Sequence, residues 1–496
     1  MSSWLGYISI SMSLVGAFLY HKFLYWQRKG VKTYHSHSLW GNFFQLQSIH
    51  HTNIVEELYK RFKGKEKMVG FYVFTRPVAL ILDLDLVRQI LVKDFDHFSS
   101  RGSYHNDKDL LMSNIFFWEA ERWRPLRNNM RTLFKPAKMR SMFNSVQKCA
   151  KNLIEAFDEA LQLQENVHIN KLSVLFTVDT ITHCLFGLEN SALRDQQNES
   201  GRIASTITAR TNYCVIKQLL GLNYYGLLQA LNMEVRLFGK EVELFFMGFL
   251  KQIFNDRERS GIKRHDMVDL LLEMRDNQGQ PSMSNNEMIA QMFIFFLVGH
   301  ESGAVAIAFV LYELAHHPHI QDKVREEILG VLKQHNNELS YETSMKLPYL
   351  EQVIAETNRR YPILNFFERT VTQDYRVENS NIVLEKGCTI YIPLQSIHYD
   401  PGFYESPQEF RPQHFHPSEA ASRHPMAFLG FGEGPRNCIG MRMGQMQMIL
   451  GLVALLSKFR FSVCEKTVQK FKISDHVFNT RVLDEIWLKV EKLEKL

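Results

Sequence analysis

A glycine-rich loop with one cysteine near its end constrains this chain more than any other segment. The loop runs from Phe431 to Gly440, reads Phe-Gly-Glu-Gly-Pro-Arg-Asn-Cys-Ile-Gly, and is followed by a long apolar segment. Glycine permits backbone dihedrals and close approaches that a side chain would block. The loop can therefore turn tightly around Cys438 and direct peptide N–H groups at its sulfur. These groups and the nearby Arg436 favour the thiolate, which is the form of cysteine that binds metal.

The surroundings of Cys438 narrow the kind of metal. Zinc sites use about four protein ligands, so a lone cysteine suits zinc poorly. A haem iron is different, because the porphyrin fills most positions and one thiolate can complete the set. A dinucleotide-binding loop is excluded, since Pro435 or Asn437 stands where the third glycine of Gly-x-Gly-x-x-Gly would fall. The remaining alternative is a glycine-rich turn around a buried thiol.

The loop resembles the haem-binding loop of the cytochromes P450, whose pattern is Phe-x-x-Gly-x-x-x-Cys-x-Gly. Phe431, Gly434, Cys438 and Gly440 fill that pattern in register. The resemblance implies haem b (iron protoporphyrin IX) with Cys438 as its axial thiolate and Phe431 as a cofactor contact. It also implies a mainly α fold with a minor β component and an N-terminal membrane anchor helix. Two further stretches look most like insect microsomal members of the detoxification-associated clan: residues 25–31 and 98–106.

An apolar segment from Met288 to Leu314 carries an acid beside a hydroxyl, Glu301 and Ser302. Such a pair is costly in an apolar helix unless it is used or satisfied. The family pattern is Ala/Gly-Gly-x-Asp/Glu-Thr, and here serine replaces the threonine. We therefore expect Glu301 and Ser302 to deliver protons beside the iron, less efficiently because serine is less rigid than threonine. The alternative is a kinked core helix.

Glu356 and Arg359 stand at i and i+3, where two side chains share one helix face. They resemble the family's Glu-x-x-Arg, which implies a buried pair that braces the fold beneath the haem. The usual third partner is an arginine, and His414 stands in its place. An imidazole is shorter than a guanidinium, so we expect a weaker or reorganised network.

Basic and aromatic residues are candidates for the haem propionates. In a helix, Trp123 and Arg127 lie one turn apart, and both can reach one carboxylate through charge-assisted hydrogen bonds. The family resemblance adds Arg369 and Arg436 to this set. The other basic residues around Trp123 suit an acidic redox partner, or form an ordinary charged surface.

The N-terminus begins with an apolar segment without charge, Trp4 to Tyr20, and basic residues follow it. About 17 residues lie at the short end for a membrane span. A cleaved signal is the rival, but the basic first region is missing. Positive charge after the span places the remaining chain in the cytosol, at the endoplasmic reticulum membrane. The predicted division is an anchor at 1–26, a linker at 27–45 and a haem domain at 46–496. Lys32 to Ser38 holds no proline, so we expect a less rigid hinge than the family has.

The remaining sequence agrees with a large, mainly helical protein. Apolar residues make up 45% of the chain, the net charge is +5, and no nucleic-acid motif is present. Six widely spaced cysteines argue against a disulfide framework. The apolar spacing predicts helices at 55–62, 139–163, 288–314 and 320–332, a surface connection at 257–286, and strands at 71–74, 79–84, 375–377, 382–384, 389–392 and 485–490.

Together these features predict a membrane-anchored haem-thiolate monooxygenase. It would insert one oxygen atom of O2 into a lipophilic xenobiotic, hormone or lipid. Electrons would come from NADPH–cytochrome P450 reductase, with cytochrome b5 as a second candidate partner. The alternatives are a P450-type isomerase or dehydratase, which commonly lacks the acid–hydroxyl pair, and a haem-binding paralogue with little activity. Candidate pocket residues are Tyr104, Ile115, Phe295, Phe296, Ile363, Leu364 and Phe478.

Overall fold

A computed structural model gives the structure of this chain. It describes residues 2–33, 51–73, 75–102, 108–189, 191–195, 197, 201, 228, 230–231, 233, 236, 238–274, 279–280, 282–469, 471 and 484–494. The predicted pocket residues Tyr104 and Phe478 lie outside these ranges.

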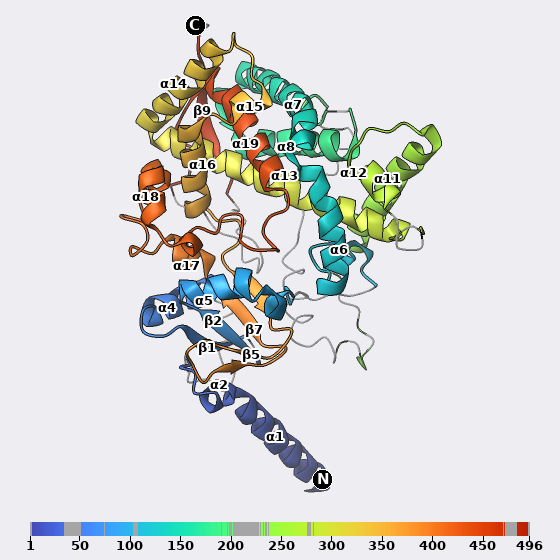
Figure 1. The fold of residues 1–496 in the computed structure, drawn as a ribbon, viewed down its shortest axis with the longest axis vertical. Helices are drawn as coiled ribbons and strands as arrows, with labels where there is room; N and C mark the ends of the chain where they lie inside the picture. Colours follow the sequence, from blue (N-terminus) through green and yellow to red (C-terminus); the bar gives the residue numbers. More distant parts are fainter. Residues whose placement is uncertain are drawn as a thin grey trace.

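One long helix, α13 (Asn285–His316), runs through the middle of the helical part (Figure 1). Ser284 and Glu287 form a capping box that fixes its first turn. The helix is apolar on nearly all sides, which is the pattern of a helix inside a core. It packs against α8 (Ile169–Phe186) and α19 (Met441–Leu456), and α7 (Pro136–Leu163) packs on both of these. These four helices form the frame on which the site is built.

The helices predicted at 55–62, 139–163, 288–314 and 320–332 are confirmed, each extended by a few residues at one or both ends. The prediction of a surface connection over 257–286 is wrong in part, because α11 continues to Ser260 and the apolar residues 267–272 belong to α12. The other helices are α1 (Ser2–Phe23), α2 (Tyr25–Arg28), α4 (His51–Phe62), α5 (Leu84–Arg88), α6 (Ala120–Met130), α11 (Lys240–Ser260), α12 (Met267–Glu273), α14 (Pro318–Gln334), α15 (Tyr341–Ser344), α16 (Pro348–Arg360), α17 (Leu394–His398) and α18 (Pro417–Ser422).

The main sheet joins parts of the chain that are far apart in sequence. Its strand order is β1 (Met68–Val73), β2 (Arg76–Ile81), β7 (Thr389–Ile392), β4 (Phe367–Thr370). β2 and β7 are parallel with Val78 opposite Thr389, and the other pairs are antiparallel. The strand predicted at 79–84 begins earlier, at Arg76, which already pairs with Val73. The smaller sheets are β3 (Asn166–His168), β9 (Trp487–Lys492) and β8 (Phe459–Ser462) in that order, and β5 (Tyr375–Arg376) with β6 (Val383–Leu384).

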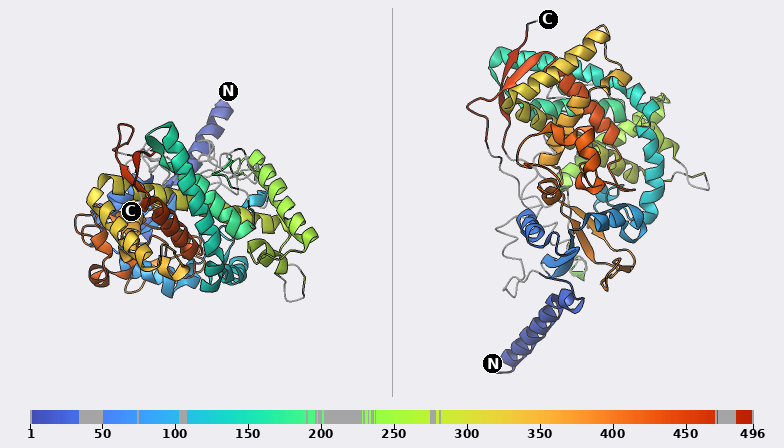
Figure 2. Two further views of the ribbon diagram at one scale, coloured as in Figure 1. Left: turned by 90° about the horizontal axis from the view of Figure 1, so that it is seen from above. Right: turned by 60° about the vertical axis from the view of Figure 1, so that its left-hand side comes forward.

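The first helix projects away from the body, as Figures 1 and 2 show. Several of its apolar side chains are exposed: Tyr7, Ile10, Met12, Leu14, Val15, Phe18 and Tyr20. At its inner end Trp26 is buried against β1, and its indole N–H donates to the carbonyl of Phe71 at 3.2 Å. Trp26 lies so close to Gly70 that a Cβ there would stand 2.3 Å from its ring. The junction after α1 is therefore packed onto the sheet.

Among the residues that the structure describes, α13 is the one helix long and apolar enough to cross a membrane. Within that stretch 67% is buried, as in the core helix of a globular protein. The burial of α13 in the protein core already explains its apolar sequence, so its length and composition are no evidence that it crosses a membrane.

Candidate active site

The loop that carries Cys438 is held by its own backbone and by the neighbouring π-helical turn at Gln89–Lys93. The N–H of Cys438 donates to the carbonyl of Phe431 at 2.8 Å, which closes the loop. Gly434 has a φ of +76°, and a Cβ there would lie 1.8 Å from the carbonyl oxygen of Leu91. Only glycine fits such an approach. The glycine predicted to shape this loop therefore has a steric partner outside it.

Cys438 lines a cavity of about 340 Å³. Its accessible surface faces this cavity although the residue lies deep in the protein. Burial raises the pKa of the Cys438 thiol, while the Gly440 N–H and the guanidinium groups of Arg127 and Arg101 lower it. The volume lies within the range of about 300–1,000 Å³ that is common for ligand sites. Residues of α13, including Phe295 and Ser302, line the same cavity.

The cavity wall is mainly apolar, and it includes most of the predicted pocket residues that the structure describes. Ile115, Phe295, Ile363 and Leu364 all line it. Phe296 does not, because its fully buried ring faces the phenylalanines of neighbouring helices and stacks on His300. Phe296 points from α13 toward α8 and α11 instead, where it meets Phe186 and Phe246.

Four arginines line the same cavity: Arg101, Arg127, Arg369 and Arg436. Burial lowers the pKa of Arg127 and Arg369 to about 10 and that of Arg436 to about 9. Burial and the other three arginines also lower the pKa of Arg101. Glu368 shares the wall, but its carboxylate faces Arg76 at 3.5 Å, and burial raises its pKa to about 7. The wall therefore carries a surplus of buried positive charge.

Several donors in this wall lack an acceptor within the part of the chain that the structure describes. They are the Nε of Arg369 and the Nε and Nη1 of Arg436. The guanidinium of Arg436 lies 4.3 Å from the centre of the Trp123 ring, so the predicted residues do meet. Unpaired buried cations are costly unless an anion pairs with them. A haem with two propionates beside a thiolate fits both the charge of this wall and the position of Cys438.

Arg101 lines the cavity but was not predicted from the sequence as a site residue. Its guanidinium lies 4.1 Å from the ring centre of Phe116, and its Nη2 donates to the carbonyl of Arg436 at 3.4 Å. The signal was present, because residues 98–106 carried part of the family resemblance. Its contact with Arg436 depends on tertiary structure, which spacing alone does not reveal.

The two residues predicted to deliver protons, Glu301 and Ser302, differ in whether they line the cavity. Ser302 lines the cavity, and its hydroxyl donates to the carbonyl of Val298 one turn earlier at 2.8 Å. Glu301, which directly precedes Ser302 on α13, is not among the lining residues. His300, which precedes Glu301, is buried, and its Nδ1–H donates to the carbonyl of Phe296 at 2.8 Å. Of this motif, the structure brings Ser302 to the cavity.

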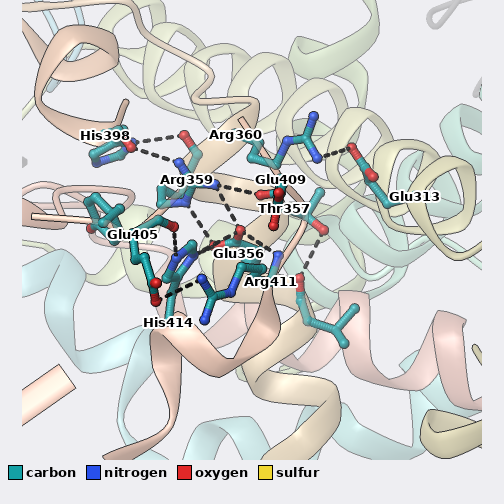
Figure 3. Close-up of polar contacts among 12 residues, drawn as sticks. Glu313, Glu356, Thr357, Arg359, Arg360, His398, Glu405, Glu409, Arg411 and His414 are labelled. Carbon is teal, nitrogen blue, oxygen red and sulfur yellow. Dashed lines mark hydrogen bonds and ion pairs between the residues drawn. The ribbon is translucent and has the colours of Figure 1, made fainter. Parts of the chain in front are cut away.

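The predicted pair of Glu356 and Arg359 is fully buried (Figure 3). The Nε and Nη2 of Arg359 donate to the two carboxylate oxygens at 2.8 Å each. The backbone N–H of Arg411 donates to the same carboxylate at 2.9 Å. Together with His414 these donors outweigh the cost of burial and lower the pKa of Glu356.

His414 takes the place of the third partner at the centre of this cluster. Its Nδ1 lies 3.2 Å from both carboxylate oxygens of Glu356, and its Nε2 lies 2.7 Å from the carbonyl of Glu405 (Figure 3). A carboxylate and a carbonyl both accept hydrogen bonds, so a doubly protonated ring fits these two contacts. The network expected here is therefore formed in spite of the replacement.

A second histidine links this cluster to the cysteine loop. The side chain of Arg359 donates to the carbonyl of His398 at 2.7 Å, and the ring Nδ1 of His398 lies 3.2 Å from the Arg359 carbonyl. Its Nε2 accepts from the N–H of Leu429 at 3.1 Å. Burial and the Arg359 charge lower the pKa of His398 to about 3, so its ring is neutral. One buried path therefore connects α16 to the residues just before the loop.

Comparison with known proteins agrees with this geometry. A sequence model of the family described as Cytochrome P450 matches residues 32–483. The chain is 38% identical over 487 residues to "Probable cytochrome P450 6a13" of Drosophila melanogaster, covering 97% of this chain and 98% of that protein. It is 34% identical over 501 residues to "Cytochrome P450 6A1" of Musca domestica, covering 98% and 97%. A third relative, "Cytochrome P450 6a8" of Drosophila melanogaster, is 35% identical over 97% of both chains.

Proposed function

The chain belongs to the cytochrome P450 family, and from this premise we propose that it oxygenates a lipophilic small molecule at a membrane. As a cytochrome P450 it is a monooxygenase that carries haem b on an axial cysteine thiolate. We further infer that NADPH–cytochrome P450 reductase supplies the electrons and that cytochrome b5 is a second donor. One observation carries the proposal: a single, largely apolar cavity is lined by both Cys438 and Ser302.

Cys438 is the residue proposed to hold the haem iron. When bound, the haem supplies the activation of O2, and thiolate ligation favours cleavage of the O–O bond. Arg127, Arg369 and Arg436 would pair with the propionates, with Trp123 beneath Arg436. Phe431, the first residue of the loop, lines the cavity and would contact the cofactor. The buried, unpartnered donors of Arg369 and Arg436 support this assignment.

Ser302 and Glu301 are proposed to move protons toward the cavity. The Ser302 hydroxyl can turn from the Val298 carbonyl to an acceptor in the cavity, since it is held by one hydrogen bond. Glu301, which precedes Ser302 in the chain, would return a proton to the Ser302 hydroxyl from the side away from the cavity. Apolar side chains such as Phe295 and Ile115 would hold the substrate and exclude water.

The membrane part of the proposal rests on α1. Its exposed side chains are tyrosine, isoleucine, methionine, leucine, valine and phenylalanine, and the helix stands clear of the body (Figure 2). An isolated apolar helix of this kind is stabilised by a lipid bilayer rather than by water. We propose that α1 anchors the chain in the endoplasmic reticulum membrane with the body in the cytosol.

A haem-binding paralogue with weak activity is the second candidate, favoured by the Ser302 hydroxyl being bonded back to its own helix. Purified holoprotein is titrated with lipophilic compounds, and the haem spin state reports binding. NADPH oxidation with added reductase is then compared with oxygenated product. Product formation that falls in Ser302→Ala and rises in Ser302→Thr supports the proposal. Substrate binding without product in wild type and in Ser302→Thr would instead identify the paralogue.

A further inference from the structure

A buried glutamine joins the helix after the cysteine loop to the turn that carries Ser302. Gln447 lies on α19, is 1% exposed, and borders the cavity. Its amide reaches α8, where Nε2 donates to the carbonyl of Thr177 at 3.3 Å and also contacts the hydroxyl of Thr180. Because the Thr177 carbonyl can only accept, the amide nitrogen must face it. The amide oxygen of Gln447 therefore faces the other way, toward α13.

On α13 the amide oxygen meets a glycine. A Cβ at Gly303 would lie 2.5 Å from Oε1 of Gln447 and 3.3 Å from a methyl group of Thr177. Gly303 follows Ser302 directly, so the space that its missing side chain leaves is occupied by the Gln447 amide. Close contact of this kind needs glycine on one side. The contact fixes how near the Ser302 turn can come to α19.

A second polar contact holds the same turn from α8. The hydroxyl of Thr177 donates to the carbonyl of His300 at 2.9 Å, and the hydroxyl of Thr180 donates to the Thr177 carbonyl at 2.9 Å. The turn from His300 to Gly303 is therefore contacted by Thr177 and Gln447, which are themselves hydrogen-bonded. Three helices meet at this polar cluster inside an otherwise apolar core.

We propose that Gln447 is a positioning residue, which sets the place of Ser302 and Glu301 relative to the helix that begins after the cysteine loop. The proposal rests on the proposed role of Ser302 and Glu301 in proton delivery. A fixed turn keeps the Ser302 hydroxyl within reach of the cavity, and small misplacements of catalytic groups reduce rates strongly. Loosening or displacing the turn should waste reducing equivalents as hydrogen peroxide rather than abolish haem binding.

The test is a double-mutant cycle on the full-length holoenzyme. Gly303→Ala pushes a methyl group against the amide, and Gln447→Ala removes the amide. Each single variant should raise the hydrogen peroxide released per NADPH by about threefold or more. In the double variant the new methyl group occupies space that the amide left, so the effect should be clearly smaller than the product of the two single effects. Multiplicative effects would overturn the proposal.

Two controls separate positioning from general packing. Gly451→Ala, also on α19, brings a Cβ to 2.8 Å from the Phe176 ring, and its three nearest atoms include none of Gln447, Thr177 or the Ser302 turn. It should lower thermal stability and leave the peroxide ratio unchanged. Ser302→Ala is the benchmark for the proposed function. If Ser302→Ala leaves the ratio unchanged, the proton-delivery role fails. If it raises the ratio but Gly303→Ala and Gln447→Ala do not, only the positioning role of Gln447 fails.

Discussion

Replacing Glu356 with glutamine tests how much the buried cluster on α16 contributes to stability. Glu356 and Arg359 are both 0% exposed, and the carboxylate accepts from two atoms of Arg359, from the Arg411 backbone and from His414. A glutamine keeps the shape but loses the charge, which leaves the Arg359 guanidinium buried without a counter-ion. Removing one partner of a buried pair costs about 3–5 kcal/mol. That is a large share of the roughly 5–15 kcal/mol that stabilises a typical protein.

The matched control is an acid–arginine pair with the same i, i+3 spacing that lies on an exposed helix surface. Asp256 and Arg259 stand at i and i+3 on α11 with side chains 55% and 76% exposed. Asp256→Asn should cost no more than about 0.5 kcal/mol, because water screens and replaces the exposed charge. Urea unfolding of the holoprotein, followed by far-UV circular dichroism, measures both variants. Equal losses for the two variants would refute the argument from burial.

Acidification gives an independent check on the same residue. The pKa of Glu356 is lowered in the folded protein, so its stabilising effect is present above the unfolded pKa of about 4.3 and is lost as the pH falls through the folded value. The stability difference between wild type and Glu356→Gln should therefore be constant from pH 6 to 5 and shrink below about pH 4.3. A difference that grows on acidification would contradict the lowered pKa.

Three further substitutions and one control substitution test other parts of the structure. Gly434→Ala should abolish the thiolate-type absorption band of the reduced CO complex, because the new Cβ meets the backbone carbonyl of the adjacent π-helical turn at 1.8 Å. Gly387→Ala shares the left-handed backbone cost of about 1–2 kcal/mol but has open space, so it should keep the band. Gly70→Ala should displace Trp26 and speed tryptic cleavage of the junction after α1 about tenfold, and unchanged cleavage would show that Trp26 does not hold it. Arg436→Leu should make the haem-free chain more stable, since it removes a buried cation that lacks an anionic partner. The same substitution should speed haem transfer to apomyoglobin by roughly tenfold or more (about 1.5–3 kcal/mol). If the stability of the haem-free chain and the retention of haem both rose or both fell, the propionate role would be contradicted.

The spacing of apolar residues close in sequence was enough to predict several helices and strands. The strand at Thr389–Ile392 has the predicted bounds, and α13 extends the predicted helix by a few residues at each end. The extension at the start has a sequence signal, the Ser-x-x-Glu of Ser284 and Glu287. The Cys438 loop and the Glu356–Arg359 pair were also within reach, because each matches a short family pattern.

Contacts between distant segments could not be predicted in the same way. Local sequence does not reveal that β2 pairs with β7, that Arg101 meets Arg436, or that Phe295 and not Phe296 lines the cavity. His414 shows the limit most clearly. Its replacement of arginine predicted a weaker or reorganised network, but its contact with the carbonyl of Glu405 through the second ring nitrogen could not be predicted.

The pairing of β2 with β7 has a consequence for synthesis of the chain. The sheet that packs around Trp26 needs strands that leave the ribosome roughly 300 residues after β2, which is on the order of 15–60 s at ordinary elongation rates. If α1 enters a bilayer first, the β1–β2 hairpin lies beside the membrane until β7 is synthesised, and the edge of β2 that pairs with β7 stays open during this time. Open edges recruit other strands. The early hairpin is therefore where we expect chaperones to act and misassembly to begin.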